Sequence, residues 1–118
     1  MFGVFGSSKV RDLTASEVMK ALQDGTVLLV DVREPSEYAA EHIQGAVHHP
    51  LSAFDPTRLP PTSERAIVMQ YGSGMRSAKA VSQCQKAGLD VDSHLAGGIA
   101  AWKAAGFPTV SASAKGAR

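Results

Sequence analysis

Hydrophobic residues in this chain fall into short uninterrupted runs that alternate with stretches of helical spacing. Residues 27–31 and 66–69 are apolar runs with little polar alternation, a pattern typical of parallel strands that are covered on both faces. Shorter runs at residues 46–48 and 91–95 predict two further strands. Prolines at positions 56, 60 and 61 indicate a loop before the strand at 66–69.

Helices are predicted around these strands. Thr14 and Glu17 form a capping box, in which the threonine hydroxyl accepts from the glutamate N–H and the glutamate side chain reaches back. Apolar residues at helical spacing follow, and Gly25 ends this helix. Pro35 opens a short helix that runs to Glu41, because proline is tolerated in the first turn. Two more helices are expected at residues 77–87 and 99–105, the second after a glycine turn at 97–98.

The alternation of strands and helices with short connections indicates an α/β fold, with an open parallel sheet and helices on both faces. We expect a single domain over residues 1–118, with its core at about 13–110 and a flexible polar tail at 111–118. In such sheets, ligands bind where strands end and helices begin. The turn between residues 69 and 77 joins an apolar run to a helix and is therefore the predicted binding place.

Composition and charge narrow the class of protein. The 118-residue chain has 12 Lys and Arg against 11 Asp and Glu, which gives a net charge of +1 and no basic footprint for nucleic acid. The longest interior aliphatic run, at 27–30, is far shorter than the roughly 20 residues that span a bilayer. No membrane association is therefore expected, and the default location is the cytoplasm. The single cysteine, Cys84, excludes an internal disulfide, and no cofactor is expected.

The segment QYGSGMRS, from Gln70 to Ser77, has the features of an anion-binding turn. Gly72 and Gly74 allow a tight backbone curl whose N–H groups can point inward. The following helix adds its positive N-terminal end at the same place. Arg76 can hydrogen-bond the carbonyls of the turn or offer its guanidinium to an anion. On these residues alone, the more frequent alternative is a glycine-rich connector with a surface arginine.

The chain resembles the rhodanese family of sulfurtransferases in three segments, which occur in the order VLLVDVREPSEYAAEHIQGAVHHP, YGSGMRSAKAV and HLAGGIAAWKAAGFPTV. The resemblance extends from about Leu13 to Val110. It implies a five-stranded, mostly parallel sheet with flanking helices and a catalytic loop from Tyr71 to Arg76. In the family, a cysteine stands first in this loop, takes a sulfane sulfur from a donor such as thiosulfate, and passes it to a thiophilic acceptor. The loop amides and the helix N-terminus stabilise the thiolate of that cysteine.

Tyr71 occupies the cysteine position of that loop. Four residues separate it from Arg76, which is the sulfurtransferase spacing, whereas related phosphatases of this fold have a loop one residue longer. A phenol oxygen cannot carry a persulfide and is a poor nucleophile at neutral pH, and its ring is large enough to fill the cradle or to project from its mouth. Cys84 is no substitute, because it lies eight residues beyond Arg76, about 12 Å along a helix, among apolar neighbours that predict a core position.

Other polar residues are expected to support the loop. The resemblance implies that Asp31 and Arg33 hold a strand end and its loops together by charge-assisted hydrogen bonds, with Arg33 close to the site as the alternative. His42 lies in the HIxGA signature of the family and is expected to be a structural hydrogen-bonding residue.

No metal site is predicted from the histidines. His48 and His49 are adjacent, so on a strand their side chains point to opposite faces. His94 is distant from both in the sequence, and no carboxylate lies at ligand spacing.

Three functions compete. The leading hypothesis is a catalytically degenerate rhodanese module that binds a small anion, such as sulfate, thiosulfate or phosphate, or a protein partner at the Tyr71 loop. The second is a sulfurtransferase that works with altered chemistry, or one whose native cysteine is replaced in this sequence. The third, a phosphatase-like activity, is disfavoured by the loop length and the missing thiolate. The predicted site residues are the degenerate nucleophile position Tyr71 with Arg76, the anion-binding loop Gly72, Ser73, Gly74, Met75, Arg76 and Ser77, and the supporting Asp31, Arg33 and His42.

Overall fold

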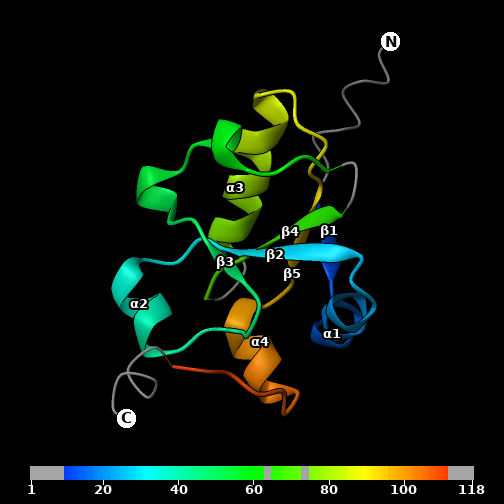
Figure 1. Ribbon diagram of the computed structural model, residues 1–118, viewed down its shortest axis with the longest axis vertical. Coiled ribbons are helices and arrows are strands. Elements are labelled where there is room, and N and C mark those ends of the chain that lie inside the picture. The colour runs from blue at the N-terminus through cyan, green and yellow to red at the C-terminus, as the bar shows by residue number, and fades with distance from the viewer. Residues whose placement is uncertain (1–9, 63–64, 73–74, 112–118) are drawn as a thin grey trace.

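Five short strands form one sheet in the described part of the chain, and every pairing between them is parallel. The computed structural model describes residues 10–62, 65–72 and 75–111, with the backbone alone at positions 75 and 76. The strand order is β1-β5-β4-β2-β3, which places β4 in the centre of the sheet (Figure 1). The strands are β1 (Arg11–Leu13), β2 (Val27–Asp31), β3 (Val47–His48), β4 (Ala66–Gln70) and β5 (Ser93–Leu95).

Helices lie on both sides of this sheet. Figure 1 shows α3 on one side and α1 and α4 on the other, while α2 lies at the end near β3. This arrangement confirms the predicted α/β fold. Among the described helices, none is long and apolar enough to cross a membrane. The helices are α1 (Ala15–Asp24), α2 (Pro35–Ala40), α3 (Met75–Lys86) and α4 (Gly98–Ala104), with 3-10 turns at Leu51–Ala53 and Pro56–Arg58.

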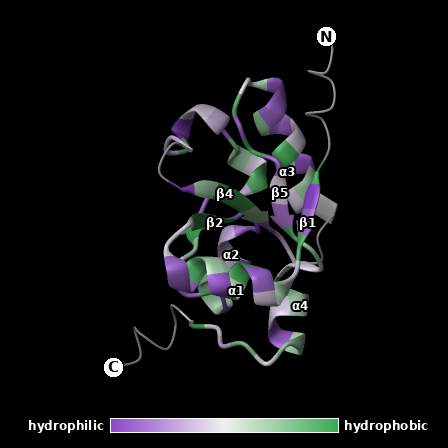
Figure 2. Ribbon diagram, turned by 90° about the vertical axis from the view of Figure 1, so that its right-hand side faces the viewer, coloured by the Kyte–Doolittle hydropathy of each residue, from purple (hydrophilic) through white to green (hydrophobic). Residues whose placement is uncertain are grey.

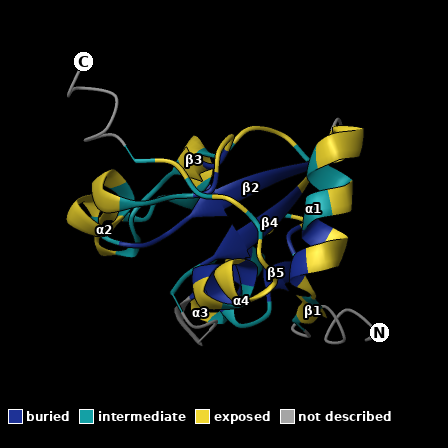
Figure 3. Ribbon diagram, turned by 90° about the horizontal axis from the view of Figure 1, so that it is seen from below, coloured by how far each residue is buried: buried dark blue, intermediate teal, exposed yellow. Residues whose placement is uncertain are grey.

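The sheet separates two hydrophobic cores, because successive side chains of a strand point to opposite faces. On β2, Leu29 packs in the core under α1 and α4, whereas Leu28 and Val30 pack in the core under α3. All of β2 is buried, as the dark central strands in Figure 3 show. Figure 2 shows hydrophobic residues in the central strands and hydrophilic ones on the flanking helices.

The capping box at the start of α1 is confirmed. The Glu17 N–H donates to Thr14 Oγ1 at 3.1 Å, and the Thr14 N–H donates to Glu17 Oε1 at 2.8 Å. Gly25 caps the other end of the helix, as predicted. Val18 is fully buried and anchors this helix to the core.

Several boundaries differ from the sequence-based expectation. The polar strand β1 was not predicted, because an exposed edge strand of three residues carries no apolar alternation. Helix α3 begins at Met75, two residues before the predicted start, since the first turn of a helix forms no hydrogen bonds through its own N–H groups and leaves no apolar pattern. Strand β5 begins at Ser93 instead of residue 91, because the Val91 N–H donates to Leu89 within a turn.

Candidate functional site

The predicted site lies at the carboxyl end of β4, the central strand, where the chain turns into α3. We call residues 71–74 the β4–α3 turn. Because all the strands are parallel, the segments that follow β2 and β3 leave the sheet at the same edge. Tyr71 and Gly72 are described, whereas Ser73, Gly74 and the side chains of Met75 and Arg76 lie outside the described residues.

The β4–α3 turn is held by its carbonyl groups to the start of α4. The Ile99 N–H donates to the Tyr71 carbonyl at 2.8 Å, and the Ala100 N–H donates to the Gly72 carbonyl at 3.3 Å. A trans peptide holds its C=O and N–H in opposite directions, and no described peptide bond is cis. The Gly72 N–H belongs to the same peptide group as the Tyr71 carbonyl, and it therefore points away from α4. An anion could approach it from that side.

Gly98 makes this contact possible, and its role was missed in the sequence, where residues 97–98 were predicted only as a turn. Its φ is +60°, in the left-handed region. A β-carbon at this position would collide with the Tyr71 carbonyl oxygen and would lie 2.6 Å from the Gly72 carbonyl carbon. The glycine is therefore required both by its backbone conformation and by the close approach of the turn.

Gln70, the last residue of β4, is a second feature that the sequence did not reveal. Its side chain is fully buried, and its Nε2 donates to the Tyr71 carbonyl at 2.9 Å. Its Oε1 has no hydrogen-bond partner among the described residues. Gln70 therefore places a buried polar side chain beneath the turn.

The Tyr71 side chain lies against the core on the α3 side of the sheet. It is half-buried and packs against the buried cluster under α3, as do the partly buried Leu51 and Phe54. Strand alternation explains this direction, because Met69 points into the same core and Gln70 to the opposite face. The ring therefore contributes to packing and does not simply extend into solvent.

Ser77, in the first turn of α3, belongs to a chain of three hydrogen-bonded side chains. Its Oγ lies 2.8 Å from His94 Nδ1, and His94 Nε2 lies 2.6 Å from Asp12 Oδ1. Ser77 is fully buried, so the trio does not expose a serine nucleophile to substrate. His94 was considered in the sequence only as a metal ligand, because its partners are far away along the chain.

Asp31 and Arg33 form a buried ion pair that organises α2. The guanidinium Nη2 lies 2.8 Å from Asp31 Oδ2, and Nε lies 3.1 Å from Oδ1. The remaining donors of Arg33 reach the carbonyls of Glu37 and Glu41 at the end of α2. These contacts direct the guanidinium to α2.

His42 is placed at the end of α2 by its contacts with one tyrosine. Its Nδ1 hydrogen-bonds the Tyr38 carbonyl at 2.7 Å, and its ring stacks on that of Tyr38 at a centroid distance of 3.8 Å. His48 stacks on the same tyrosine ring at 4.4 Å. Burial, and then the charge of Asp31, raise the pKa of the Tyr38 phenol. These contacts hold His42 beside α2.

Cys84 lies in the core, as predicted. It is fully buried in the cluster under α3, and burial raises the pKa of its thiol to about 11. At neutral pH this group is a thiol, which is neither a nucleophile nor a metal ligand in that form. No group of three or more potential metal ligands occurs among the described residues.

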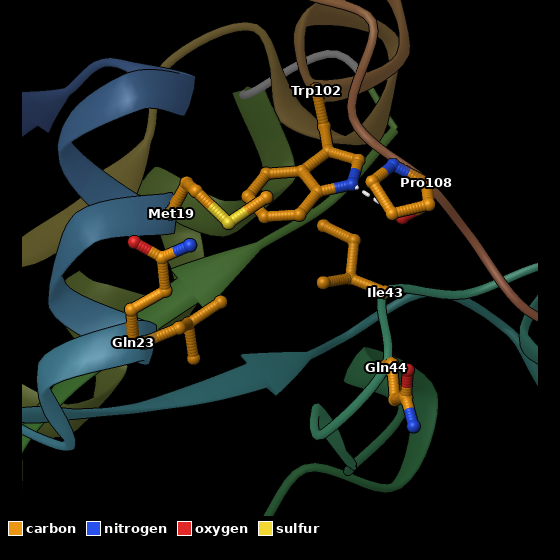
Figure 4. Close-up of a pocket in the computed structure, with 7 residues that line it drawn as sticks. Met19, Gln23, Ile43, Gln44, Trp102 and Pro108 are labelled. Atoms are coloured by element: carbon orange, nitrogen blue, oxygen red, sulfur yellow. Dashed lines mark hydrogen bonds between the residues drawn. The ribbon is translucent and has the colours of Figure 1, made fainter.

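A separate hollow of about 310 Å³ lies between α1 and α4 (Figure 4). The Trp102 Nε1 donates to the Pro108 carbonyl at 2.8 Å at its edge. Its lining has no ionisable side chain, so the hollow offers apolar contact and no acid–base chemistry. The lining residues are Met19, Leu22, Gln23, Ile43, Gln44, Trp102 and Pro108.

Comparisons of the sequence and of the structure with known proteins agree on one family. A family model described as a rhodanese-like domain matches residues 14–105. An uncharacterized protein from Synechocystis is 46% identical over 88 residues, which cover 75% of this chain and 49% of that protein. The probable adenylyltransferase/sulfurtransferase MoeZ of Mycobacterium tuberculosis is 37% identical over 101 residues, covering 81% of this chain and 25% of MoeZ. The chain therefore spans half or less of the length of these two relatives.

Other matches extend over more than three quarters of the matched protein. A sulfurtransferase from Allochromatium vinosum is 31% identical over 103 residues, covering 86% of this chain and 96% of that protein. The solution structure of a rhodanese-like domain from Anabaena superposes with a TM-score of 0.72 at 31% identity, covering 85% of this chain and 78% of that one. A rhodanese-related protein from Thermoplasma volcanium gives a TM-score of 0.73 at 26% identity, with coverage of 85% and 97%.

Proposed function

This chain belongs to the rhodanese-like domain family, and from that premise we propose that it is a member without sulfur transfer whose β4–α3 turn binds a small anion. Tyr71 stands where the family carries its persulfide-forming cysteine. The ligand would be an oxyanion such as sulfate, thiosulfate or phosphate. A protein partner could present the same chemistry through an acidic or oxyanionic group.

The docking of the turn on α4 is the observation that carries this proposal. The carbonyls of Tyr71 and Gly72 are directed to the N–H groups of Ile99 and Ala100, so the Gly72 N–H points to the opposite side. Helix α3, 12 residues long, begins at the same place, and its N-terminal end favours negative charge. This electrostatic arrangement does not depend on a thiol.

The absence of sulfur transfer rests on the chemistry of two side chains. The Tyr71 phenol cannot form a persulfide, because it has no sulfur to accept the transferred atom. Cys84, the only cysteine in the sequence, is buried and protonated, and so cannot replace the missing thiolate.

The first test is a sulfate titration followed by backbone amide shifts. We expect saturable shifts at Gly72 and along the start of α3, and no thiosulfate-to-cyanide sulfur transfer above background. Flat shifts at high sulfate would contradict anion binding. Thiocyanate production that survives Cys84→Ala would contradict the absence of catalysis, and production that Cys84→Ala abolishes would show that Cys84 is reactive after all.

A second candidate function is sulfur transfer. It would take place either with altered chemistry or in a natural protein that carries cysteine at position 71. The match to the sulfurtransferase of Allochromatium vinosum along 96% of its length favours it. The transfer assay described above separates this candidate from the first. Sequencing the natural gene at codon 71 tests whether tyrosine is the native residue.

A further inference from the structure

We propose that a hollow beside α3 binds a small zwitterion of the α-amino acid class, whose ammonium group meets Glu34 and whose carboxylate meets Lys79. The hollow has a volume of about 340 Å³. Its lining residues are Glu34, Leu51, Ser52 and Lys79, and the structure describes all four. None of them belongs to the β4–α3 turn, so this site is independent of the anion binding proposed above.

The walls of the hollow come from three segments that leave the sheet at one edge. Glu34 precedes α2 after β2, the 3-10 turn Leu51–Ala53 follows β3, and Lys79 lies in the second turn of α3, after β4. The Leu51 N–H donates to the Val32 carbonyl at 2.9 Å and ties the 3-10 turn to the end of β2. Because β3, β2 and β4 are parallel neighbours, the hollow lies outside their carboxyl ends, where open α/β sheets bind ligands.

Two opposite charges face this hollow without pairing with each other. The ion pairs found in the described part of the chain involve neither Glu34 nor Lys79. Both side chains nevertheless line the same space. The carboxylate and the ammonium group are therefore separated across the hollow, and a ligand can lie between them.

The Glu34 carboxylate is held in position before any ligand binds. Ser52 Oγ donates to Glu34 Oε1 at 2.9 Å, and the Glu34 N–H donates to Glu37 Oε1 at 3.0 Å. Groups that are already ordered lose less freedom on binding, so the ordering cost at this wall is small. A carboxylate offers about four acceptor positions, and it can therefore accept from a ligand ammonium group while it holds Ser52.

The charges of the lining select the class of ligand. One carboxylate and one ammonium group give the hollow no net charge, so a ligand with a single charge is attracted by one wall and gains nothing from the other. A zwitterion satisfies both walls at once. An α-amino acid carries both charged groups on one carbon atom, and the half-buried Leu51 offers an apolar contact for its side chain.

A titration with L-alanine, followed by backbone amide shifts, tests this proposal. We expect saturable shifts at Ser52 and Lys79. N-acetyl-L-alanine lacks the ammonium group and L-alaninamide lacks the carboxylate, so each should bind about threefold to fivefold more weakly than L-alanine, the range of one partly exposed ion pair.

Three variants assign the two charges. Lys79→Ala should weaken L-alanine about threefold to fivefold and leave L-alaninamide unaffected. Glu34→Gln keeps an acceptor for Ser52, and it should weaken L-alanine to a similar extent and leave N-acetyl-L-alanine unaffected. Lys86→Ala is the matched control, because Lys86 is an exposed lysine in the last turn of the same helix and lies outside the hollow. This variant should keep the affinity of the wild type.

Several results would overturn the proposal: the absence of saturable shifts, equal binding of the three compounds, or an equal loss of affinity in Lys86→Ala. If Glu34→Gln folds poorly because Glu34 begins α2, the exposed Lys79→Ala decides the question, and an unchanged affinity for L-alanine refutes the site. The sulfate titration is read at Gly72, whereas this one is read at Ser52 and Lys79. Failure of one proposal is therefore distinguishable from failure of the other.

Discussion

At the scale of single residues, Tyr71 contributes to the structure through both its backbone carbonyl and its ring. Its carbonyl accepts from Ile99 and from Gln70, which fixes the β4–α3 turn. Its half-buried ring packs against the core under α3. The first role belongs to the backbone and is independent of the side chain, so the turn should tolerate another residue at this position.

Tyr71→Cys is therefore expected to install measurable sulfur transfer. The introduced thiolate would attack the sulfane sulfur of thiosulfate, release sulfite and form a persulfide, from which cyanide takes the outer sulfur as thiocyanate. Because the half-buried ring is lost, we expect unfolding free energy to fall by about 1–2 kcal/mol. The measurements are a thiosulfate–cyanide assay and mass spectrometry for a one-sulfur adduct.

Tyr71→Ser is the matched control for this substitution. It removes the same ring but supplies no sulfur, so it should show the stability loss without the adduct. A folded Tyr71→Cys protein with neither turnover nor adduct would mean that the turn has lost more than its nucleophile.

At the scale of elements, the turn depends on where α4 begins. Local sequence correctly predicted a helix after the glycine pair, within one residue at each end. It could not show that the first N–H groups of α4 are satisfied by the carbonyls of Tyr71 and Gly72, almost 30 residues earlier. Nor could it show that α3 starts at Met75, because the apolar pattern of a helix is absent from its first turn.

Gly98→Ala should loosen this contact and destabilise the fold. The new methyl group would collide with the Tyr71 carbonyl in a left-handed backbone, and we expect a loss of about 2–4 kcal/mol in urea unfolding. The Gly72 amide should shift and sulfate binding should weaken. Gly106→Ala shares the left-handed φ, at +84°, but has nothing within 4 Å of the added carbon. The unfolding free energy of Gly106→Ala should fall by only about 1 kcal/mol. Equal losses in Gly98→Ala and Gly106→Ala would show that the predicted collision does not exist.

At the scale of the whole molecule, Glu41 ties three distant segments together. Its carboxylate accepts from Lys103 Nζ at 2.8 Å and from Thr109 Oγ1 at 2.7 Å. Next to it, His42 and Val110 exchange two backbone hydrogen bonds. The end of α2 is thereby joined to α4 and to the last described segment of the chain.

This connection predicts a dependence of stability on acid. The hydrogen bonds from Lys103 and then Thr109 hold the pKa of Glu41 below its ordinary value of 4.5. A carboxyl whose folded pKa is lowered stabilises the fold above its unfolded pKa, and this contribution is lost as the pH falls through the folded value. Wild type should therefore lose stability below about pH 4.5, as measured by urea unfolding.

Glu41→Gln should lower the unfolding free energy at pH 7 by about 1 kcal/mol or less, because the group is partly exposed. It should also reduce the acid slope, which is the decrease in unfolding free energy as the pH falls below about 4.5. Asp24→Asn is the control, since Asp24 pairs with Lys20 within one exposed helical turn. It should change stability by less than about 0.5 kcal/mol. An unchanged acid slope in Glu41→Gln would refute the assigned role.

The sequence by itself determined several elements and supplied the motive for the proposed function. Uninterrupted apolar runs set β2 and β4, and the capping box set α1, because each of these patterns depends on neighbours in the chain. The tyrosine at position 71 is the residue from which we propose the loss of sulfur transfer. Only the tertiary structure decided what surrounds the turn: the approach of Gly98, the buried amide of Gln70 and the trio of Ser77, His94 and Asp12. The periodicity of the sequence indicates which face of a helix or strand a side chain lies on. These contacts join segments that are distant in the sequence and meet only when the strands pair in the sheet.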